Sequence, residues 1–162
     1  MITDKLLMFS EAQAVTDTAA STDVIDLGPI DGKRRDIGVG YPLEFWALVN
    51  TAATASGDAT VNIQLQTSEN NSSWTTIYDS GALAKTALTA GKRVVSAKVP
   101  AGVQRYLRVN YSVATGPLTA GEFTALIPSA QAITRFAQRM HSHPLSAQIS
   151  TRFIILLLSA AF

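Results

Sequence analysis

The chain contains no cysteine, which excludes a disulfide framework and a thiolate metal ligand or nucleophile. Charged residues are also scarce, at 15% of 162 residues, whereas about 25% is usual in soluble domains. Hydrophobic residues make up 47%, and the polar remainder is mostly Ser, Thr, Asn, Gln and Gly. Such a surface fits either an ordinary β domain or a face that lies against other protein.

The net charge is only +1, so the chain has no global positive field that would attract nucleic acid. Its distribution is uneven, because residues 1–128 hold ten Lys/Arg against twelve Asp/Glu, whereas residues 129–162 hold three arginines and no acid. The sign of the charge therefore changes near residue 128. We take this change as the boundary between a main domain and an extension.

No apolar run approaches the roughly 20 residues that a membrane-spanning helix needs. The longest run of large apolar residues is Phe153–Leu158, and at the N-terminus the apolar stretch Leu6–Phe9 follows the charged pair Asp4 and Lys5. This N-terminus is not typical of a secretory signal. We therefore expect a soluble chain that is not exported by the usual route and has no membrane partner.

Short strand candidates with period-two alternation recur along residues 1–128, separated by turn residues. The clearest is Thr60–Thr67, in which Val61, Ile63 and Leu65 alternate with polar residues. The eight candidates are Gln13–Thr16, Asp23–Leu27, Leu43–Thr51, Thr60–Thr67, Trp74–Asp79, Lys92–Val99, Arg105–Val113 and Glu122–Ile127. Short strands without intervening helices predict an all-β fold, either an eight-stranded antiparallel jelly-roll sandwich or an immunoglobulin-like sandwich.

The C-terminal extension has a different pattern. Ile133, Phe136, Ala137 and Met140 have the spacing of a short amphipathic helix, which the proline at position 144 should end. The apolar run that follows is compatible with a strand or an extended arm. We therefore divide the chain into an N-terminal arm with a weak first strand (1–22), a jelly-roll domain (23–128) and a C-terminal helix and arm (129–162).

Residues that carry chemistry are sparse. His141 and His143 have no acid nearby, and a metal site usually needs a third ligand. Serine, histidine and aspartate form no recognisable nucleophile motif. Carboxylates sit mostly at turns, where Asp commonly accepts hydrogen bonds from the backbone: Asp23, Asp26, Asp31, Asp36 and Asp58. We expect no enzymatic activity, no metal and no cofactor.

Two other features have both a purely structural and a functional interpretation. The basic segment Lys33–Asp36 is either a solvated loop or a contact for an acidic protein surface, and it lacks the interleaved aromatics of a nucleic-acid site. Trp46, Trp74 and Tyr78 are either core residues or a stacking platform for sugars. The second possibility would make the chain a carbohydrate-binding β-sandwich module.

Three stretches resemble the small cement, or decoration, proteins of tailed-bacteriophage capsids, of the jelly-roll type. They are MITDKLLMFSEAQAVT (1–16), RDIGVGYPL (35–43) and RYLRVNYSVATGPLTAGEFTALI (105–127). GPLTAG and the strand before it are the most specific part. The resemblance covers roughly residues 1–128, and residues 129–162 extend beyond the family's pattern, which leaves their role open.

The resemblance implies a structural virion protein on the outer capsid surface, made in the host cytoplasm, that bridges neighbouring major capsid proteins. It also implies self-association, with a dimer favoured over a trimer, and no direct contact with nucleic acid. The residues that we expect at a capsid or subunit interface come from the N-terminal arm, the basic loop and the extension: Leu6, Leu7, Met8, Phe9, Lys33, Arg34, Arg35, Tyr41, Arg135, Arg139, Arg152, Phe153, Ile154 and Ile155.

Overall fold

The computed structural model describes residues 4–28, 36–39 and 43–128. Within these ranges the chain forms nine β-strands and two 3-10 turns. In chain order they are η1 (Lys5–Leu7), β1 (Met8–Ala14), β2 (Ala19–Ala20), β3 (Ile25–Asp26), β4 (Glu44–Thr54), β5 (Thr60–Ser68), β6 (Thr75–Ala84), η2 (Lys85–Ala87), β7 (Arg93–Lys98), β8 (Tyr106–Ala114) and β9 (Ala120–Leu126).

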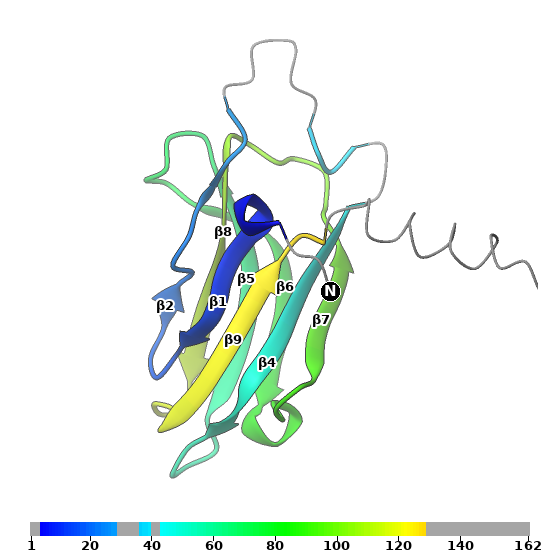
Figure 1. The fold of residues 1–162 in the computed structure, drawn as a ribbon. Coiled ribbons are helices and arrows are strands. Elements are labelled where there is room, and N and C mark those ends of the chain that lie inside the picture. Colours follow the sequence, from blue (N-terminus) through cyan, green and yellow to red (C-terminus); the bar gives the residue numbers. More distant parts are fainter. Residues whose placement is uncertain (1–3, 29–35, 40–42, 129–162) are drawn as a thin grey trace, which may run out of the picture. The chain divides into compact units, whose positions relative to one another are not determined.

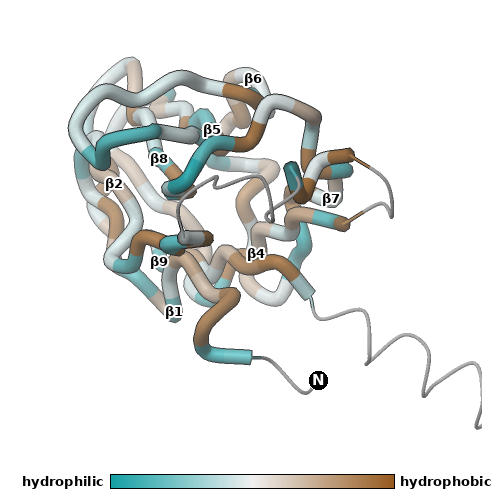
Figure 2. The backbone as a smooth tube through the Cα atoms, turned by 90° about the horizontal axis from the view of Figure 1, so that it is seen from above, coloured by the Kyte–Doolittle hydropathy of each residue, from teal (hydrophilic) through white to brown (hydrophobic). Residues whose placement is uncertain are grey.

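The strands form two antiparallel sheets that face each other (Figures 1 and 2). One sheet has the order β1-β9-β4-β7, and the other has the order β2-β8-β5-β6 with β3 also on β8. β2 pairs with β8 at Tyr111, and β3 pairs with β8 at Leu107. β2 and β3 therefore act together as one interrupted strand. Counted in this way, eight strands follow the jelly-roll order, in which the first strand pairs with the last. The predicted fold class is confirmed.

The core lies between the sheets because β4, β5, β8 and β9 bury alternate side chains along much of their length. On β5, Val61, Ile63 and Leu65 are fully buried, and the residues between them face outward. On β8, Leu107 and Val109 are buried in the same way. Burying a large apolar side chain contributes about 1.5–3 kcal/mol, so these alternating positions account for much of the stability of the sandwich.

The first strand begins earlier than the sequence pattern predicted. It runs over Met8–Ala14 rather than Gln13–Thr16, and from Met8 on it is part of the sandwich rather than an arm. Its pairing with β9 is interrupted between Ser10 and Gln13, where Ala12 has a φ of 44°. Such a bulge breaks the period-two alternation and hides the strand from a pattern search.

Strand β6 continues past Asp79, where the sequence pattern ended the strand, and runs to Ala84. Asn62 pairs with Ala82 and Gln64 with Asp79, so β6 has one extra residue between these pairs. Gly81, with a φ of 70°, lies in this bulge. The Ser80 hydroxyl accepts the backbone N–H of Ile63 at 2.9 Å and replaces the missing ladder acceptor.

The strand expected over 23–27 is limited to Ile25–Asp26, since the N–H of Asp23 bonds to the Phe9 carbonyl on β1 and not to β8. The helix expected over 133–140 and the apolar arm over 153–158 lie outside the described residues. No helix in the described part of the chain is long and apolar enough to cross a membrane.

Candidate interface at the loop end of the sandwich

One end of the sandwich brings together the segments in which the sequence placed an interface. At this end β1 and β4 begin and β9 ends, because Met8 and Trp46 both pair with Leu126. In the other sheet β5 ends and β8 begins here, where Ser68 pairs with Tyr106. We call this the loop end (upper end in Figure 1), made of residues 4–7, 36–39, 69–74, 99–105 and Pro128.

Leu6 is the most exposed large hydrophobic side chain among the described residues, at 81%. It lies on η1, whose shape is fixed by Asp4: the Asp4 carboxylate accepts the N–H of Leu6 at 3.0 Å, and its carbonyl accepts that of Leu7 at 3.0 Å. The carbonyl of Leu7 in turn accepts the N–H of Ile127 at 2.9 Å. The leucine is therefore held outward by a turn fastened to the sandwich.

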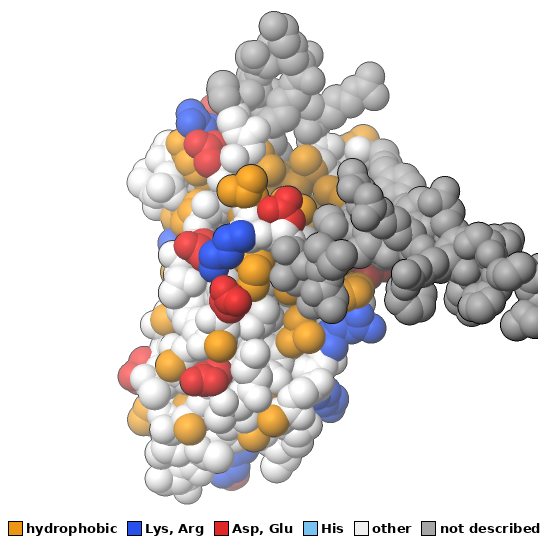
Figure 3. Space-filling view, in the orientation of Figure 1, with side chains coloured by type: hydrophobic (Ala, Val, Ile, Leu, Met, Phe, Trp, Pro, Cys, Tyr) orange, Lys and Arg blue, Asp and Glu red, His pale blue; other side chains and the backbone are white. Residues whose placement is uncertain are grey.

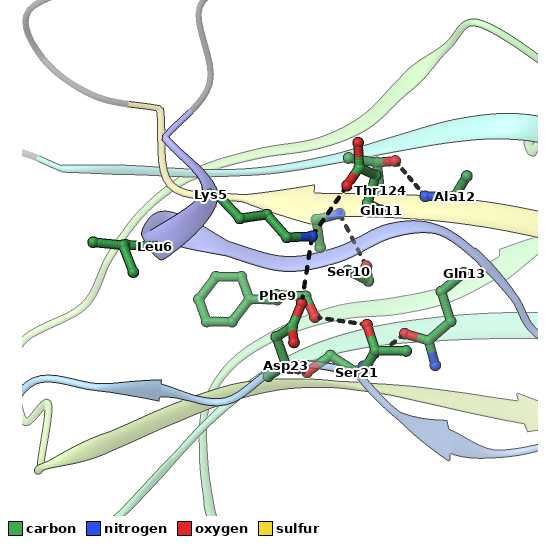
Figure 4. Close-up of polar contacts among 12 residues, drawn as sticks. Lys5, Leu6, Phe9, Ser10, Glu11, Ala12, Gln13, Ser21, Asp23 and Thr124 are labelled. Carbon is green, nitrogen blue, oxygen red and sulfur yellow. Dashed lines mark hydrogen bonds and ion pairs between the residues drawn. The ribbon is translucent and has the colours of Figure 1, made fainter.

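A lysine beside this leucine joins two parts of the chain. Lys5 Nζ lies 3.1 Å from Glu11 Oε2 on β1 and 3.8 Å from Asp23 Oδ2 just before β3 (Figure 4). The hydrogen bond that Lys5 donates to Glu11, together with the negative charge of Glu11, raises the pKa of Lys5. All three side chains are at least half exposed, so the ion pairs orient the turn more than they stabilise the fold.

The rest of the expected N-terminal contact lies inside the molecule. Met8 is 6% exposed and Phe9 is fully buried, with its ring 5.9 Å from that of Phe45 in an edge-on contact. Leu7 is partly buried and packs against the same core. Met8 and Phe9 therefore expose almost nothing to a partner, whereas Leu7 is partly accessible. Sequence periodicity missed this because the bulge at Ala12 shifts the phase of the strand.

The second described part of the loop end is the turn at residues 36–39. The Asp36 carboxylate accepts backbone N–H groups of Gly38 at 2.9 Å, Gly102 at 2.5 Å and Val103 at 3.2 Å. Gly38 packs so closely on Pro100 that a Cβ would overlap the Pro100 carbonyl. The turn therefore presents Val39, which is 62% exposed, from a fixed position.

Several expected interface residues lie outside the described residues. In the loop these are Lys33, Arg34, Arg35 and Tyr41, which flank the turn at 36–39. In the extension they are Arg135, Arg139, Arg152, Phe153, Ile154 and Ile155. The expected histidine pair, His141 and His143, belongs to the same extension.

The three aromatics of the possible sugar platform do not share a surface. Trp46 alternates with buried residues of β4 and so faces outward, with the Arg93 guanidinium 4.3 Å from its ring centre. Trp74 lies under the guanidinium of Arg108, which faces outward from the other sheet. The Tyr78 ring packs inward, 6.0 Å from Phe45. The two tryptophans therefore lie on opposite outer faces, each covered by an arginine.

Carboxylates in the described part mostly fasten turns, as expected. Asp26 accepts the N–H of Gly28 at 2.8 Å, and Asp79 accepts that of Gly81 at 2.7 Å. The bond from Gly81, with further ones from Gln64 and Asn62, lowers the pKa of Asp79. No three His, Cys, Asp or Glu side chains within the described ranges are grouped so as to hold a metal ion.

The face made by β1, β9, β4 and β7 carries acidic and basic side chains scattered among polar ones, with hydrophobic groups more frequent toward the loop end (Figure 3). The described residues therefore define a jelly-roll domain with a rigid, partly apolar loop end.

Residues 9–127 match the Bbp16 family, and the chain belongs to that family. The name suggests a phage-related protein. No curated protein matches the chain significantly. The matched range begins at Phe9 and ends at Ile127, so it covers the sandwich except for Met8, the first residue of β1, and stops before the extension.

Proposed function

We propose that this protein is a structural virion component, not an enzyme, that binds the outer surface of a phage capsid and stabilises the shell. The phage-related family name and the three stretches that resemble capsid cement proteins support the proposal. The observation that carries it is Leu6, because a leucine that is 81% exposed on a fastened turn is a preformed apolar anchor.

The geometry of the loop end suits a protein partner. Leu6 and Val39 are presented by turns that are already hydrogen-bonded, so binding would order little additional backbone. The basic sequence at 33–35 adjoins the second of these turns and supplies positive charge for an acidic patch on the partner. The proposed partner is the major capsid protein, with self-association of the cement protein as a dimer.

Stabilisation of a shell requires a preference for one lattice. A ligand that binds immature and expanded shells with equal affinity does not shift the equilibrium between them. The proposed site is therefore one that is complete only between neighbouring subunits of the expanded lattice. A dimer would bind two such sites at once. After the first contact, the second subunit has a high effective concentration at the neighbouring site. Each occupied site adds about 2.7 kcal/mol when free protein stands at 100 times its dissociation constant.

The alternative of a carbohydrate-binding module has no specific support in the described residues. Its platform would need Trp46 and Trp74 on one face, and they lie on opposite faces. A glycan array with the full chain would test it directly. Selective glycan binding that is lost on Trp46→Ala or Trp74→Ala would favour the module over the cement protein.

The proposal is tested with phage particles that lack this protein. We expect them to assemble but to release DNA at a lower temperature or after milder osmotic shock, and added protein should restore their resistance. Co-sedimentation with expanded and unexpanded shells measures the preference between lattices. Equal binding to both shells would contradict the stabilising mechanism, and the absence of binding to either would contradict the function.

A further inference from the structure

The two long sides of the sandwich are closed differently. On one side, β1 is joined to the chain around β2 and β3. The N–H of Asp23 donates to the Phe9 carbonyl at 2.9 Å, and Gln13 Nε2 bonds to the last carbonyl of β2. The other side is formed by β6 and β7, the last strands of their sheets, and within the described residues no hydrogen bond joins these two strands. The sandwich therefore has an open side along β6 and β7 (Figures 1 and 2).

Of the two strands on the open side, β7 offers the more regular edge. The pairing of β6 with β5 shifts register twice, between Asn62 and Gln64 and between Leu65 and Gln66. Such bulges twist an edge away from further pairing. The pairing of β7 with β4 shifts only once, and from Val95 to Lys98 its register is continuous. A further strand can therefore continue this sheet beyond β7.

The backbone of β7 presents hydrogen-bonding groups to the open side. The N–H of Val99 donates to the Leu43 carbonyl, on the side of β4, at 2.8 Å. Opposed residues of an antiparallel pair alternate between hydrogen-bonded and non-hydrogen-bonded positions, so the backbone groups of Ala97 also face β4. Those of Ser96 and Lys98 face the opposite way, and both residues are exposed. Among the described strands none pairs with this side of β7.

The side chains on the outer face of β7 are basic. Lys98 pairs with Glu44, and the Arg93 guanidinium lies over the ring of Trp46. The Glu44 carboxylate accepts Trp46 Nε1 at 2.6 Å, and the ion pairs of the described residues involve neither Lys98 nor Arg93. Lys92 adds a third positive charge just before the strand, and Figure 3 shows basic side chains along this margin of the sheet. Their charge is available to a partner.

The side chains on the inner face of β7 are apolar. Val95 is buried in the core, and Ala97 is partly buried against it. On β6, the other strand of the open side, Ile77 and Leu83 are also only partly buried. Apolar side chains placed beside β7 would extend this layer and remove more of its surface from water.

These two faces define the chemistry of an added strand. Side chains on neighbouring strands interact directly across a sheet, so acidic residues suit its outer positions, beside Lys98 and Arg93, and apolar residues suit its inner positions. The residues outside the described ranges contain a single acid, Asp31, so this chain does not supply an acidic segment of its own. A second copy of β7 would bring the same basic charges, which oppose pairing.

We propose that the open edge of β7 binds an extended segment of another protein, in which apolar and acidic residues alternate, as an added β-strand. Main-chain hydrogen bonds to Ser96 and Lys98 hold the segment, and the basic outer face selects acidic side chains. The inference adds a contact separate from the loop end. It does not depend on the proposed function, because the edge is open whatever the protein assembles with.

The test uses the full chain and a fluorescein-labelled peptide of alternating valine and glutamate, about ten residues long, the upper range for a strand. We expect saturable binding by fluorescence anisotropy. Ser96→Pro removes an outward N–H that an edge strand does not need for its own fold, so it should weaken binding at least about tenfold. Ser96→Ala keeps the N–H and is the matched control. Circular dichroism of both variants establishes that the sandwich is intact.

Two further comparisons separate strand addition from simple attraction between charges. A peptide of the same composition, with all valines before all glutamates, should bind several-fold more weakly, because it cannot place acidic and apolar residues on opposite faces. Lys98→Glu should weaken binding of the glutamate peptide and strengthen binding of a peptide of alternating valine and lysine. Equal binding of the alternating and block peptides would overturn the proposal, and so would failure of the alternating peptide to bind.

Amide hydrogen exchange locates the bound peptide. The N–H groups of Ser96 and Lys98 should exchange quickly in the free protein and at least about tenfold more slowly with saturating peptide, whereas those of β6 should not change. Protection of β6 instead would assign the contact to the wrong edge. Slow exchange at Ser96 and Lys98 without peptide would also overturn the proposal: if it increased with protein concentration, a second copy would occupy the edge, and if it did not, the chain itself would.

Discussion

The hydroxyl oxygens of Ser10 and Tyr111 lie 2.6 Å apart in the core, so a buried hydrogen bond joins β1 of one sheet to β8 of the other. Ser10 lies on β1 and Tyr111 on β8, and both side chains are fully buried. Ser10 Oγ also accepts the backbone N–H of Ala125 at 3.1 Å, at a point where the β1–β9 register shifts. The serine therefore satisfies a backbone group that the bulged ladder leaves without its strand partner.

Removing this serine should cost more than removing the tyrosine hydroxyl. Ser10→Ala leaves both the Tyr111 hydroxyl and the Ala125 N–H without a partner, and each buried unsatisfied group costs about 1–3 kcal/mol. Tyr111→Phe leaves Ser10 with its backbone partners, so we expect a loss of about 1 kcal/mol. Urea unfolding of both single variants and the double variant gives the coupling energy. A coupling near zero would show that the bond does not contribute.

The same tyrosine predicts a loss of stability at alkaline pH. Burial raises the pKa of Tyr111 above its ordinary value of 10.0, and the hydrogen bond with Ser10 opposes the shift in part. A raised pKa in the folded state means that this contribution is fully present below pH 10 and is lost as the pH rises toward the folded pKa. The loss amounts to about 1.4 kcal/mol per pH unit in that window.

The measurement compares the free energy of unfolding of the wild type and Tyr111→Phe at pH 8 and pH 11. The difference between the two proteins should shift against the wild type by about 1.4 kcal/mol over the unit above pH 10. The phenylalanine variant serves as the control for lysines and other groups that titrate in the same range. A constant difference would contradict the burial of the hydroxyl.

The close packing of Gly38 on Pro100 predicts a specific glycine effect. Gly38→Ala places a Cβ against the Pro100 carbonyl, and relieving such overpacking costs about 1–3 kcal/mol. Gly57→Ala is the matched control, since its Cβ would lie 3.9 Å from the nearest atom, the Thr115 carbonyl oxygen. We expect that variant to be within about 0.5 kcal/mol of the wild type by thermal unfolding. Equal effects of the two changes would show that the turn at 36–39 is not tightly packed.

Because Leu6 is exposed, a substitution there should change binding to the shell without changing the stability of the fold. Leu6→Asp should leave the melting temperature nearly unchanged, because the side chain is 81% exposed. It should weaken binding to expanded shells at least about tenfold if the leucine is an interface anchor. Thr89→Asp, at an exposed position between η2 and β7 toward the opposite end of the sandwich, is the control and should bind normally. Normal binding by Leu6→Asp would remove this residue from the interface.

The sequence by itself determined the all-β class and most of the strands, because long strands such as β4, β5 and β8 alternate buried and outward side chains. In Thr60–Ser68 and Tyr106–Ala114 the inward residues are those that the alternation assigns to the core. The carboxylates at turns were also predictable, since Asp26 and Asp36 both accept backbone N–H groups. These features depend on local geometry, which neighbouring residues in the chain express directly.

Only the tertiary structure decided which side chains are exposed and which of them lie next to one another on the surface. Met8 and Phe9 form an apolar stretch with Leu6 in sequence, yet Leu6 alone of these three is exposed, because the start of β1 pairs with β9 from the far end of the domain. The same long-range pairing sets Met8, Leu126 and Trp46 in register on the three adjacent strands β1, β9 and β4. It also places Trp46 and Trp74 on opposite faces. Such neighbours come from segments distant in the sequence, so no local pattern encodes them.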